Sequence, residues 1–359
     1  MTTPAAQKRP LKSRDDYTVG WIAALPSELA AATAILDEEH GEPTDHSPAP
    51  SNSNAYTWGR MGQHDVVIAA LPAGVYGTVS AASTAMQMLP SFPNIRVGLM
   101  VGIGAAISRP EQGRDIRLGD VVVSQPSETN GGVVQYDLGK AIDGHELKRK
   151  GVLNMPPEAI LKALTTLQAR HDLEGSKIAK HLSDMVNRYP RLGKARSGKP
   201  GYVHQGTKND RLFKTAYLHA GGSNCEGCDS AEEILRDDIN RDDDEVEIHY
   251  GTIASGNLLV KNAHVRDYIA NTVGKDCICL EMEAAGLMNS FPCLVIRGIC
   301  DYADSHKNDQ WQNYAAATAS AYAKDFLSIM PAGDVASTRK ATQILDISQS
   351  SEHVYANIR

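Results

Sequence analysis

Three groups of acidic residues, each placed directly after an apolar run, are the side chains in this sequence best suited to chemistry. Glu28 follows the run at 17–25, Glu281 and Glu283 follow the run at 277–280, and Asp301 follows the run at 293–300. A single carboxylate in such a place is usually a helix cap. Because open α/β sheets bind ligands beyond the carboxyl ends of their strands, three such groups together predict one shared site.

The elements that must position these carboxylates are short β-rich runs alternating with helical runs. This alternation predicts an α/β domain with three layers, α/β/α, around a mixed central sheet. We expect strands at 17–24, 56–60, 65–70, 97–101, 121–124, 247–254, 277–281 and 293–299. We expect helices at 27–37, 78–88, 157–171, 177–189, 263–272 and 314–329, and another from residue 284. Gly102-Ile103-Gly104 is read as the loop that ends the strand at 97–101.

Composition along the chain divides it into one large domain with polar ends. The 359 residues are 42% hydrophobic, which is enough for a substantial core. We expect a disordered tail at 1–16, one domain at 17–330 and a tail or linker at 331–359. Residues 191–247 are rich in Gly, Asp, Lys and Asn and are predicted to form a polar excursion from the core.

Charge and cysteine usage narrow the partners and the compartment. The formal net charge of −7 gives no basic excess for nucleic acid, so the expected partner is a small molecule. The longest uncharged apolar stretch, 97–107, is shorter than the roughly 20 residues of a membrane span. Four of the six cysteines lie in apolar segments, and the start of the chain lacks a signal peptide's apolar region. We therefore expect a cytoplasmic protein with no membrane partner.

Seven short motifs occur in a recognisable order. They are A-L-P-S-E-L (24–29), A-G-V-Y-G-T-V (73–79), V-G-I-G-A-A-I (101–107), L-G-D-V-V-V-S (118–124), A-S-G-N (254–257), L-E-M-E-A (280–284) and R-G-I-C-D-Y-A-D (297–304). In this order the chain resembles the nucleoside phosphorylase and nucleosidase superfamily, particularly the methylthioadenosine/adenosylhomocysteine nucleosidases. It also resembles the version of this domain at the N-terminus of fungal multidomain receptors.

The resemblance implies a phosphorylase/hydrolase-like fold and cleavage of the N-glycosidic bond of a purine nucleoside, as in purine salvage. Departure of the base leaves positive charge on the ribose, so the reaction needs an acid for the base and a nucleophile for C1′. By resemblance, Asp301 protonates the base, Glu28 activates the attacking water and Glu283 binds the ribose hydroxyls.

The remaining pocket residues are also implied by resemblance. Met282 is expected to pack under the sugar, and Glu281 and Arg297 to orient the other groups. The positions that contact the base are Gly104, Ala105, Leu259 and Val260. Because Leu259 replaces a stacking aromatic residue of the nucleosidases, the preferred base stays open. No cofactor is required by this chemistry, and the resemblance implies a homo-oligomer.

The choice between water and phosphate as nucleophile depends on cations. Phosphorylases of this superfamily hold phosphate with arginines, whereas Met100 precedes Val101 here and Glu28 would repel an anion. Hydrolysis is therefore favoured. Phosphorolysis stays as an alternative because Arg96 and Arg109 are near in sequence. A second alternative is a nucleoside- or nucleotide-sensing module without turnover, which would not need both an acid and a base.

One further cluster lies within the polar excursion. His219, Cys225 and Cys228 form the pattern H-x5-C-x2-C, which could supply three ligands to a structural zinc ion, with His204 or His249 as a distant fourth. The plainer interpretation is a flexible loop with incidental thiols.

Overall fold

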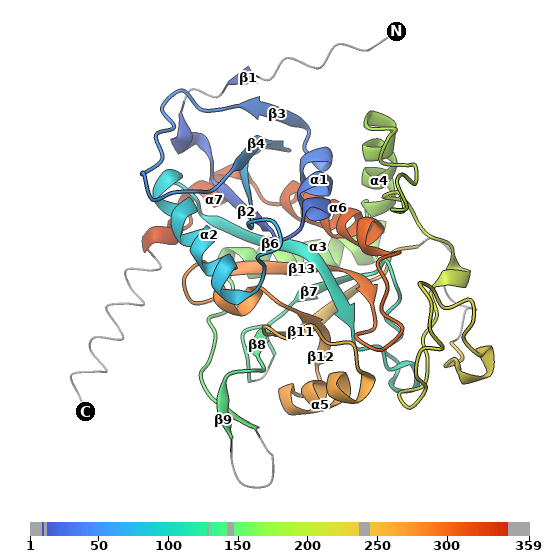
Figure 1. The fold of residues 1–359 in the computed structure, drawn as a ribbon. Helices are drawn as coiled ribbons and strands as arrows, with labels where there is room; N and C mark the ends of the chain where they lie inside the picture. The colour runs from blue at the N-terminus through green and yellow to red at the C-terminus, as the bar shows by residue number, and fades with distance from the viewer. Residues whose placement is uncertain (1–8, 11–12, 128, 142–146, 237–244, 344–359) are drawn as a thin grey trace.

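The computed structural model describes residues 9–10, 13–127, 129–141, 147–236 and 245–343 (Figure 1). Most of the predicted tail at 1–16 and the later part of the predicted tail at 331–359 lie outside these ranges. Among the helices that the structure describes, none combines the length and apolar character that crossing a bilayer requires.

The strands form one mixed sheet. The described residues give eleven strands in it, ordered β1-β3-β4-β5-β2-β6-β12-β11-β7-β13, with β8 paired to β11. Their bounds are β1 Arg9–Pro10, β2 Val19–Ala23, β3 Glu38–Gly41, β4 Tyr56–Met61, β5 His64–Ala70, β6 Val97–Ala106, β7 Val121–Ser124, β8 Val133–Gln135, β11 Ile248–Ser255, β12 Cys277–Glu281 and β13 Cys293–Asp301. A separate antiparallel pair is formed by β9 (Gly139–Ala141) and β10 (Leu147–Arg149).

Part of the sheet closes on itself. The long strand β6 pairs with β2 and β13 in parallel, and its last residues pair with β12 in antiparallel fashion. In addition, β12 pairs with β11, β11 with β7, and β7 with β13. The five strands β6, β12, β11, β7 and β13 therefore form a closed ring. The ring brings the ends of β12 and β13 and the second half of β6 close to the end of β2.

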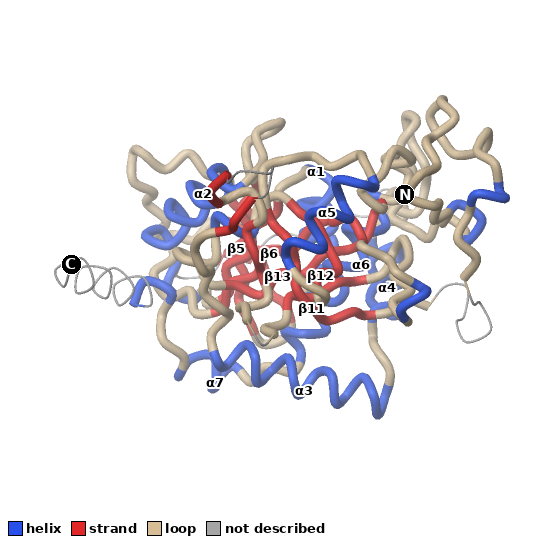
Figure 2. Tube along the Cα trace, turned by 90° about the horizontal axis from the view of Figure 1, so that it is seen from below, coloured by secondary structure: helices blue, strands red, loops and turns tan. Residues whose placement is uncertain are grey.

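Helices cover both faces of the sheet, which confirms the predicted three-layer α/β/α architecture (Figure 2). One face packs against α1 (Pro26–Ile35), α3 (Glu158–Glu174), α4 (Ile178–Arg188) and α6 (Gln312–Ser328). The other face packs against α2 (Thr78–Ser91), and α5 (Ala263–Val273) lies against β11 and β12. Alternation along β2 divides the two cores, since Trp21 faces α1 and α6 whereas Ile22 faces α2.

Two local predictions were wrong. The helix expected from residue 284 is a single 3₁₀ turn, Ala284–Gly286, because Gly286 lies against the backbone of Thr78, where an added Cβ would be 1.9 Å from its carbonyl oxygen. Gly102-Ile103-Gly104 is not a loop but the middle of β6, whose pairing with β13 continues through it. At these positions glycine allows neighbouring side chains to come close to the strand, and it does not form a turn.

Residues 331–343, the described part of the predicted tail, pack against the domain. Helix α7 (Ala332–Ser337) buries Val335, and the N–H of Ala341 donates to the carbonyl of Ile95 at 2.9 Å. The segment lacks the apolar periodicity from which a helix is predicted. Contacts with the rest of the domain, through Val335 and Ala341, hold this segment in place.

Strand β13 and helix α6 pack so closely that adding one methyl group at Gly298 should strongly reduce the stability of the protein. An added Cβ at Gly298 would lie 1.8 Å from the carbonyl oxygen of Ala315, so Gly298→Ala forces strand and helix apart. We expect a loss of about 3 kcal/mol in the free energy of unfolding, measured by urea denaturation. Gly333→Ala, where nothing lies within 4 Å, is the control and should change it by less than about 1 kcal/mol. Equal effects would contradict the packing described.

Candidate active site

Glu28 joins the end of β2 to the middle of β6. It lies in the first turn of α1, where Oε2 accepts hydrogen bonds from the N–H groups of Ala24 (2.6 Å) and Leu25 (2.9 Å). Its Oε1 accepts from the N–H of Ile103 at 2.8 Å. The side chain is buried. An added Cβ at Gly102 would lie 2.4 Å from Oε1, so glycine is required for this approach.

Arg297, on β13, is the cation around which the carboxylates gather. It is 1% exposed and forms ion pairs with Glu281 and with Glu283, whose Oε2 lies 3.3 Å from Nη2. Its Nη1 also donates to the carbonyl of Ile103 at 3.2 Å. Burial opposes its charge, but the negative charges of Glu281, Glu283 and Glu28 raise the pKa of Arg297 above its ordinary value.

One guanidinium does not fully compensate the surrounding carboxylates. Burial raises the pKa of Glu28, although Arg297 and three backbone N–H groups partly offset the shift. Burial also raises the pKa of Glu283 to about 7, against Arg297, and the charges of Glu281 and Glu28 add to the rise. The site therefore holds one carboxyl group, Glu283, that exchanges its proton near neutral pH, and a second, Glu28, whose pKa lies above its ordinary value.

Glu281 and Glu283 are held by the turn that follows β12. Glu281 accepts hydrogen bonds from the N–H groups of Glu283 and Ala284, each at 3.0 Å to Oε2. The hydroxyl of Ser255, at the end of β11, accepts from the N–H of Ala285 at 2.8 Å. Glu283 reaches across to α2, where the N–H of Gly77 donates to its Oε1 at 3.4 Å.

Asp301 lies at the end of β13 with a cation beside it. Its Oδ1 accepts from the N–H of Ala303 at 2.8 Å, and Lys307 forms an ion pair with Oδ2. Burial opposes the charge of Lys307, but Cys300 and Asp301 raise its pKa above the ordinary value. Ala303 has φ of 52°, an unusual value for a residue with a side chain and typical of strained functional segments. The sequence pattern gave no sign of Lys307.

The carboxylates open into one cavity of about 270 Å³. The residues predicted for the site that line it are Glu28, Gly104, Ala105, Leu259, Val260, Glu281, Met282, Glu283 and Asp301. Arg297 lies behind this wall rather than on it. Residues that the sequence analysis did not assign also line it, among them Tyr76, Lys261, Lys307, Asp309 and Gln312. Tyr76 belongs to the A-G-V-Y-G-T-V motif, so the sequence contained a pattern from which it could have been assigned to the site. It supplies an aromatic side chain to the cavity.

Hydrogen bonds from neighbouring elements fix the loop carrying Leu259. The hydroxyl of Tyr136 donates to the carbonyl of Leu258 at 3.1 Å. Asp137 accepts from the N–H of Asn257 at 2.8 Å. The side-chain oxygen of Asn257 in turn accepts from the N–H of Thr78 at 3.1 Å, at the start of α2. One wall of the cavity is thus tied to the helix whose N-terminal end contacts Glu283.

A second, larger hollow of about 410 Å³ lies away from the carboxylates. It is bordered by charged side chains that are paired with one another. Arg236 lies 3.0 Å from Asp210, and Arg211 pairs with Glu233. Because the arginines that line it are paired with carboxylates and the three predicted carboxylates line the smaller cavity, we place the candidate active site in the smaller cavity.

Comparison with known proteins supports the fold. No family model matches the sequence. The chain is 43% identical over 329 residues to a nucleotide-binding leucine-rich repeat (NLR)-like protein of Hyaloscypha variabilis. This match covers 92% of this chain and 31% of that protein. It is 25% identical over 320 residues to the ATP nucleosidase Cap17 of Escherichia coli, covering 85% of this chain and 50% of Cap17. The chain thus spans half or less of these relatives.

Solved structures resemble the chain over nearly their whole length. Futalosine hydrolase of Helicobacter pylori matches with a TM-score of 0.53 and 15% identity, over 88% of this chain and 99% of that one. A 5′-methylthioadenosine/S-adenosylhomocysteine nucleosidase of Neisseria meningitidis matches with a TM-score of 0.53 and 14% identity, over 87% and 98%. The chain has the nucleoside phosphorylase/nucleosidase fold. In sequence, it is related to the NLR-like protein and to Cap17.

Removing the central cation should destabilise the protein in a pH-dependent way. Arg297→Met leaves Glu28, Glu281 and Glu283 buried without their partner, and we expect a loss of about 3–5 kcal/mol in the free energy of unfolding. Protonation relieves the repulsion, so the loss should be larger at about pH 8 than at about pH 5. Urea denaturation at both pH values measures this.

The matched control is Arg60→Met, which removes an exposed ion pair with Glu38 and should cost less than about 1 kcal/mol at either pH. A loss for Arg297→Met that is equal at the two pH values would contradict the electrostatic explanation.

Proposed function

We propose that this chain hydrolyses the N-glycosidic bond of a purine nucleoside, releasing the free base and ribose. The observation that carries the proposal is the meeting of Glu28, Glu283 and Asp301 on the wall of one cavity. They come from three strand ends far apart in the sequence. The similarity to two nucleosidase structures and to an ATP nucleosidase supports the same class of reaction.

Glu28 is the proposed base for the attacking water. Its carboxylate is fixed by three backbone N–H groups, so its position does not depend on substrate. Burial raises its pKa, which makes the ionised form a better proton acceptor than an exposed glutamate. Water attacks C1′, its proton passes to Glu28, and the bonding electrons of the C1′–N bond leave with the base.

Glu283 is the proposed partner of the ribose hydroxyls. Its ionised carboxylate accepts their hydrogen bonds, and this interaction strengthens as positive charge develops on the sugar. The side chain is held from behind by Arg297, which leaves it lining the cavity. Met282, beside it, provides an apolar surface for the sugar.

Asp301 is the proposed group that delivers a proton to the departing base. The ammonium of Lys307 against the same carboxylate supplies a second proton-bearing group at this end of the cavity. A negative carboxylate has no proton of its own to deliver, so the proton comes from the Lys307 ammonium and passes through Asp301 to the base. Lys307 is left neutral until it takes up a proton from solvent. Leu259 and Val260 form the apolar side, and Tyr76 offers a surface on which an aromatic ring can stack.

Hydrolysis is proposed rather than phosphorolysis because the arginines that could hold phosphate are engaged elsewhere. Arg96 donates to the carbonyl of Thr338, and Arg109 donates to the side chain of Asn271 at 3.0 Å. Met100 is buried in the core. Among the described residues that line the cavity, the cations are Lys261 and Lys307, and Lys307 is paired with Asp301.

A purine nucleoside triphosphate is a second candidate substrate for the same reaction. The similarity to Cap17 favours it, and Lys261 at the border of the cavity offers a positive charge to a 5′-phosphate. A substrate panel that includes adenosine, inosine, 5′-methylthioadenosine and ATP separates these candidates.

Product analysis tests the reaction. We expect free base and free sugar, or sugar phosphate from a nucleotide, from at least one member of the panel whether or not phosphate is present. Asp301→Asn and Glu28→Gln should each reduce kcat by about 10²–10⁴-fold. Glu111→Gln, which changes an exposed glutamate in the turn Pro110–Gln112, is the control and should retain full activity.

Other outcomes would contradict the proposal in defined ways. Ribose 1-phosphate formed only with phosphate would show a phosphorylase. Tight binding without product would show a sensing module, a role in keeping with the similarity to the NLR-like protein. Full activity of Asp301→Asn would remove Asp301 from the reaction.

The pH dependence follows from the raised pKa of Glu283. Its ionised form binds the hydroxyls, so kcat/KM should fall as the pH drops below about 7 and Glu283 becomes protonated. Initial rates between about pH 5 and 9 at low substrate concentration measure this limb. Glu283→Gln should have low activity over the whole range and lose the limb near neutrality. A profile flat through pH 7 in the unmodified chain would contradict the role given to Glu283.

A further inference from the structure

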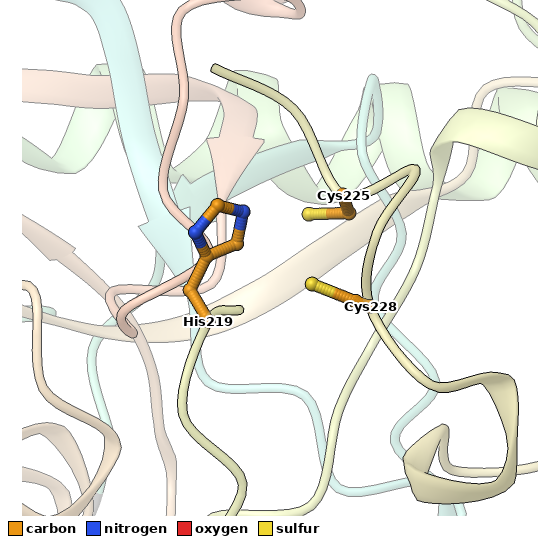
Figure 3. Close-up of side chains that lie close together, drawn as sticks. All are labelled: His219, Cys225 and Cys228. Atoms are coloured by element: carbon orange, nitrogen blue, oxygen red, sulfur yellow. The ribbon is translucent and has the colours of Figure 1, made fainter. Parts of the chain in front are cut away.

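We propose that His219, Cys225 and Cys228 bind one zinc ion that fastens the polar excursion to the loop following Asp301. The ligand atoms of the three residues all lie within 4.8 Å of one another. Figure 3 shows both sulfur atoms and the histidine ring facing a common space. Two thiolates and an imidazole are a typical ligand set for tetrahedral zinc.

The two cysteines are held in a geometry that suits a metal. The N–H of Cys228 donates to the carbonyl of Cys225 at 3.0 Å, which closes a tight turn between them. Arg211 donates to the carbonyls of both cysteines, at 3.1 Å for Cys228, and is itself fixed by Glu233. The turn is thus ordered by hydrogen bonds that do not use the sulfurs, and the sulfurs remain available as ligands.

Binding requires small and balanced changes at the three residues. The two thiols release one proton each to solvent, so the dication is neutralised by two thiolates. His219 now donates from Nε2 to the carbonyl of Asn224 at 2.9 Å and accepts at Nδ1 from the N–H of Gly221 at 3.1 Å. Coordination through Nε2 replaces the first bond and moves the ring proton to Nδ1, so the second bond, in which Nδ1 accepts from the N–H of Gly221, is lost as well. Gly221 and Gly222 have open space around them, so the loop can adjust.

A buried histidine beside the cluster, His306, is the fourth ligand that we propose. Its ring nitrogens are not among the ligand atoms that lie within 4.8 Å of one another, so its ring has to move to coordinate the metal. His306 is 6% exposed, and within the described part of the chain neither of its ring nitrogens has a hydrogen-bond partner, although Nδ1 lies 3.5 Å from a carboxylate oxygen of Asp304. Its ring meets that of His219 edge-on at a centroid distance of 5.4 Å. Its carbonyl oxygen is 4.0 Å from the sulfur of Cys225. Buried ring nitrogens without partners are costly, and coordination to a metal would satisfy one of them.

The polar excursion has few buried apolar side chains to stabilise it, so a bound metal ion would add to its stability. Within 191–236, the buried apolar side chains are Leu212, Phe213 and Cys228. This is too small a core to fix a long segment, and a metal can replace a core in such a case. The N–H of His219 donates to the hydroxyl of Ser305 at 3.0 Å. The metal would therefore hold the same loop that carries Lys307 against Asp301.

Metal titration tests the proposal directly. The full chain is reduced, stripped with a chelator and titrated with zinc against a chromophoric competitor. We expect one zinc ion per chain. Cobalt in place of zinc should give the intense visible bands of a tetrahedral site and a thiolate-to-cobalt charge-transfer band in the near ultraviolet. The double variant Cys225→Ala/Cys228→Ala should bind neither metal at this stoichiometry, whereas Cys277→Ala, which changes a buried cysteine of β12, should still bind one equivalent.

A second measurement keeps the test valid if the double variant does not fold. In the unmodified chain, zinc should protect 191–236 from limited proteolysis, and removal of zinc should expose cleavage sites there. His306→Asn should weaken zinc binding by about 10–100-fold. Zinc binding that survives in the double variant, or a reduced chain that binds none, would overturn the proposal. So would a Cys225–Cys228 disulfide that forms readily in the presence of zinc.

Discussion

The structure depends on one buried guanidinium placed among three carboxylates. Arg297 lies inside the protein on β13, with Glu281 and Glu283 paired to it and Glu28 close enough to affect its pKa. Each of these charges alone would be costly to bury, and removal of the cation would leave several negative groups without compensation. Burial, which the single positive charge offsets only in part, raises the pKa of Glu28 and of Glu283, and this makes these two groups suited to proton transfer.

Closure of the sheet is what brings these groups together. The ring of β6, β12, β11, β7 and β13 places the turn after β12 beside the end of β13, and β6 carries the backbone N–H that binds Glu28. Gly102 permits this approach because any side chain there would overlap the carboxylate. The same strand, β13, therefore supplies both the central cation, Arg297, and Asp301 on the wall of the cavity.

The two ends of the cavity differ in how their charge is balanced. At one end, Glu28 and Glu283 share Arg297 from within the protein. At the other end, Asp301 is paired with Lys307, which lies on the cavity wall and can meet a ligand. The loop bearing Lys307 is joined to the polar excursion through Ser305 and His219. A segment that looks peripheral in the sequence thus contacts the loop that completes the site.

Local patterns, namely apolar runs with acidic residues directly after them, were enough to predict the α/β/α class, most strand and helix positions, and the set of carboxylates. Glu28, Glu283 and Asp301 do line one cavity, with Met282 and Leu259. The ring closure, the 3₁₀ turn at Ala284–Gly286 and the partners of the charges depend on contacts between distant segments. Lys307 could not be identified because its role comes from contact with Asp301, and a lone lysine in a polar loop has no periodic signature. Long-range pairing and burial arise when distant segments meet, and no local pattern encodes the distance between them.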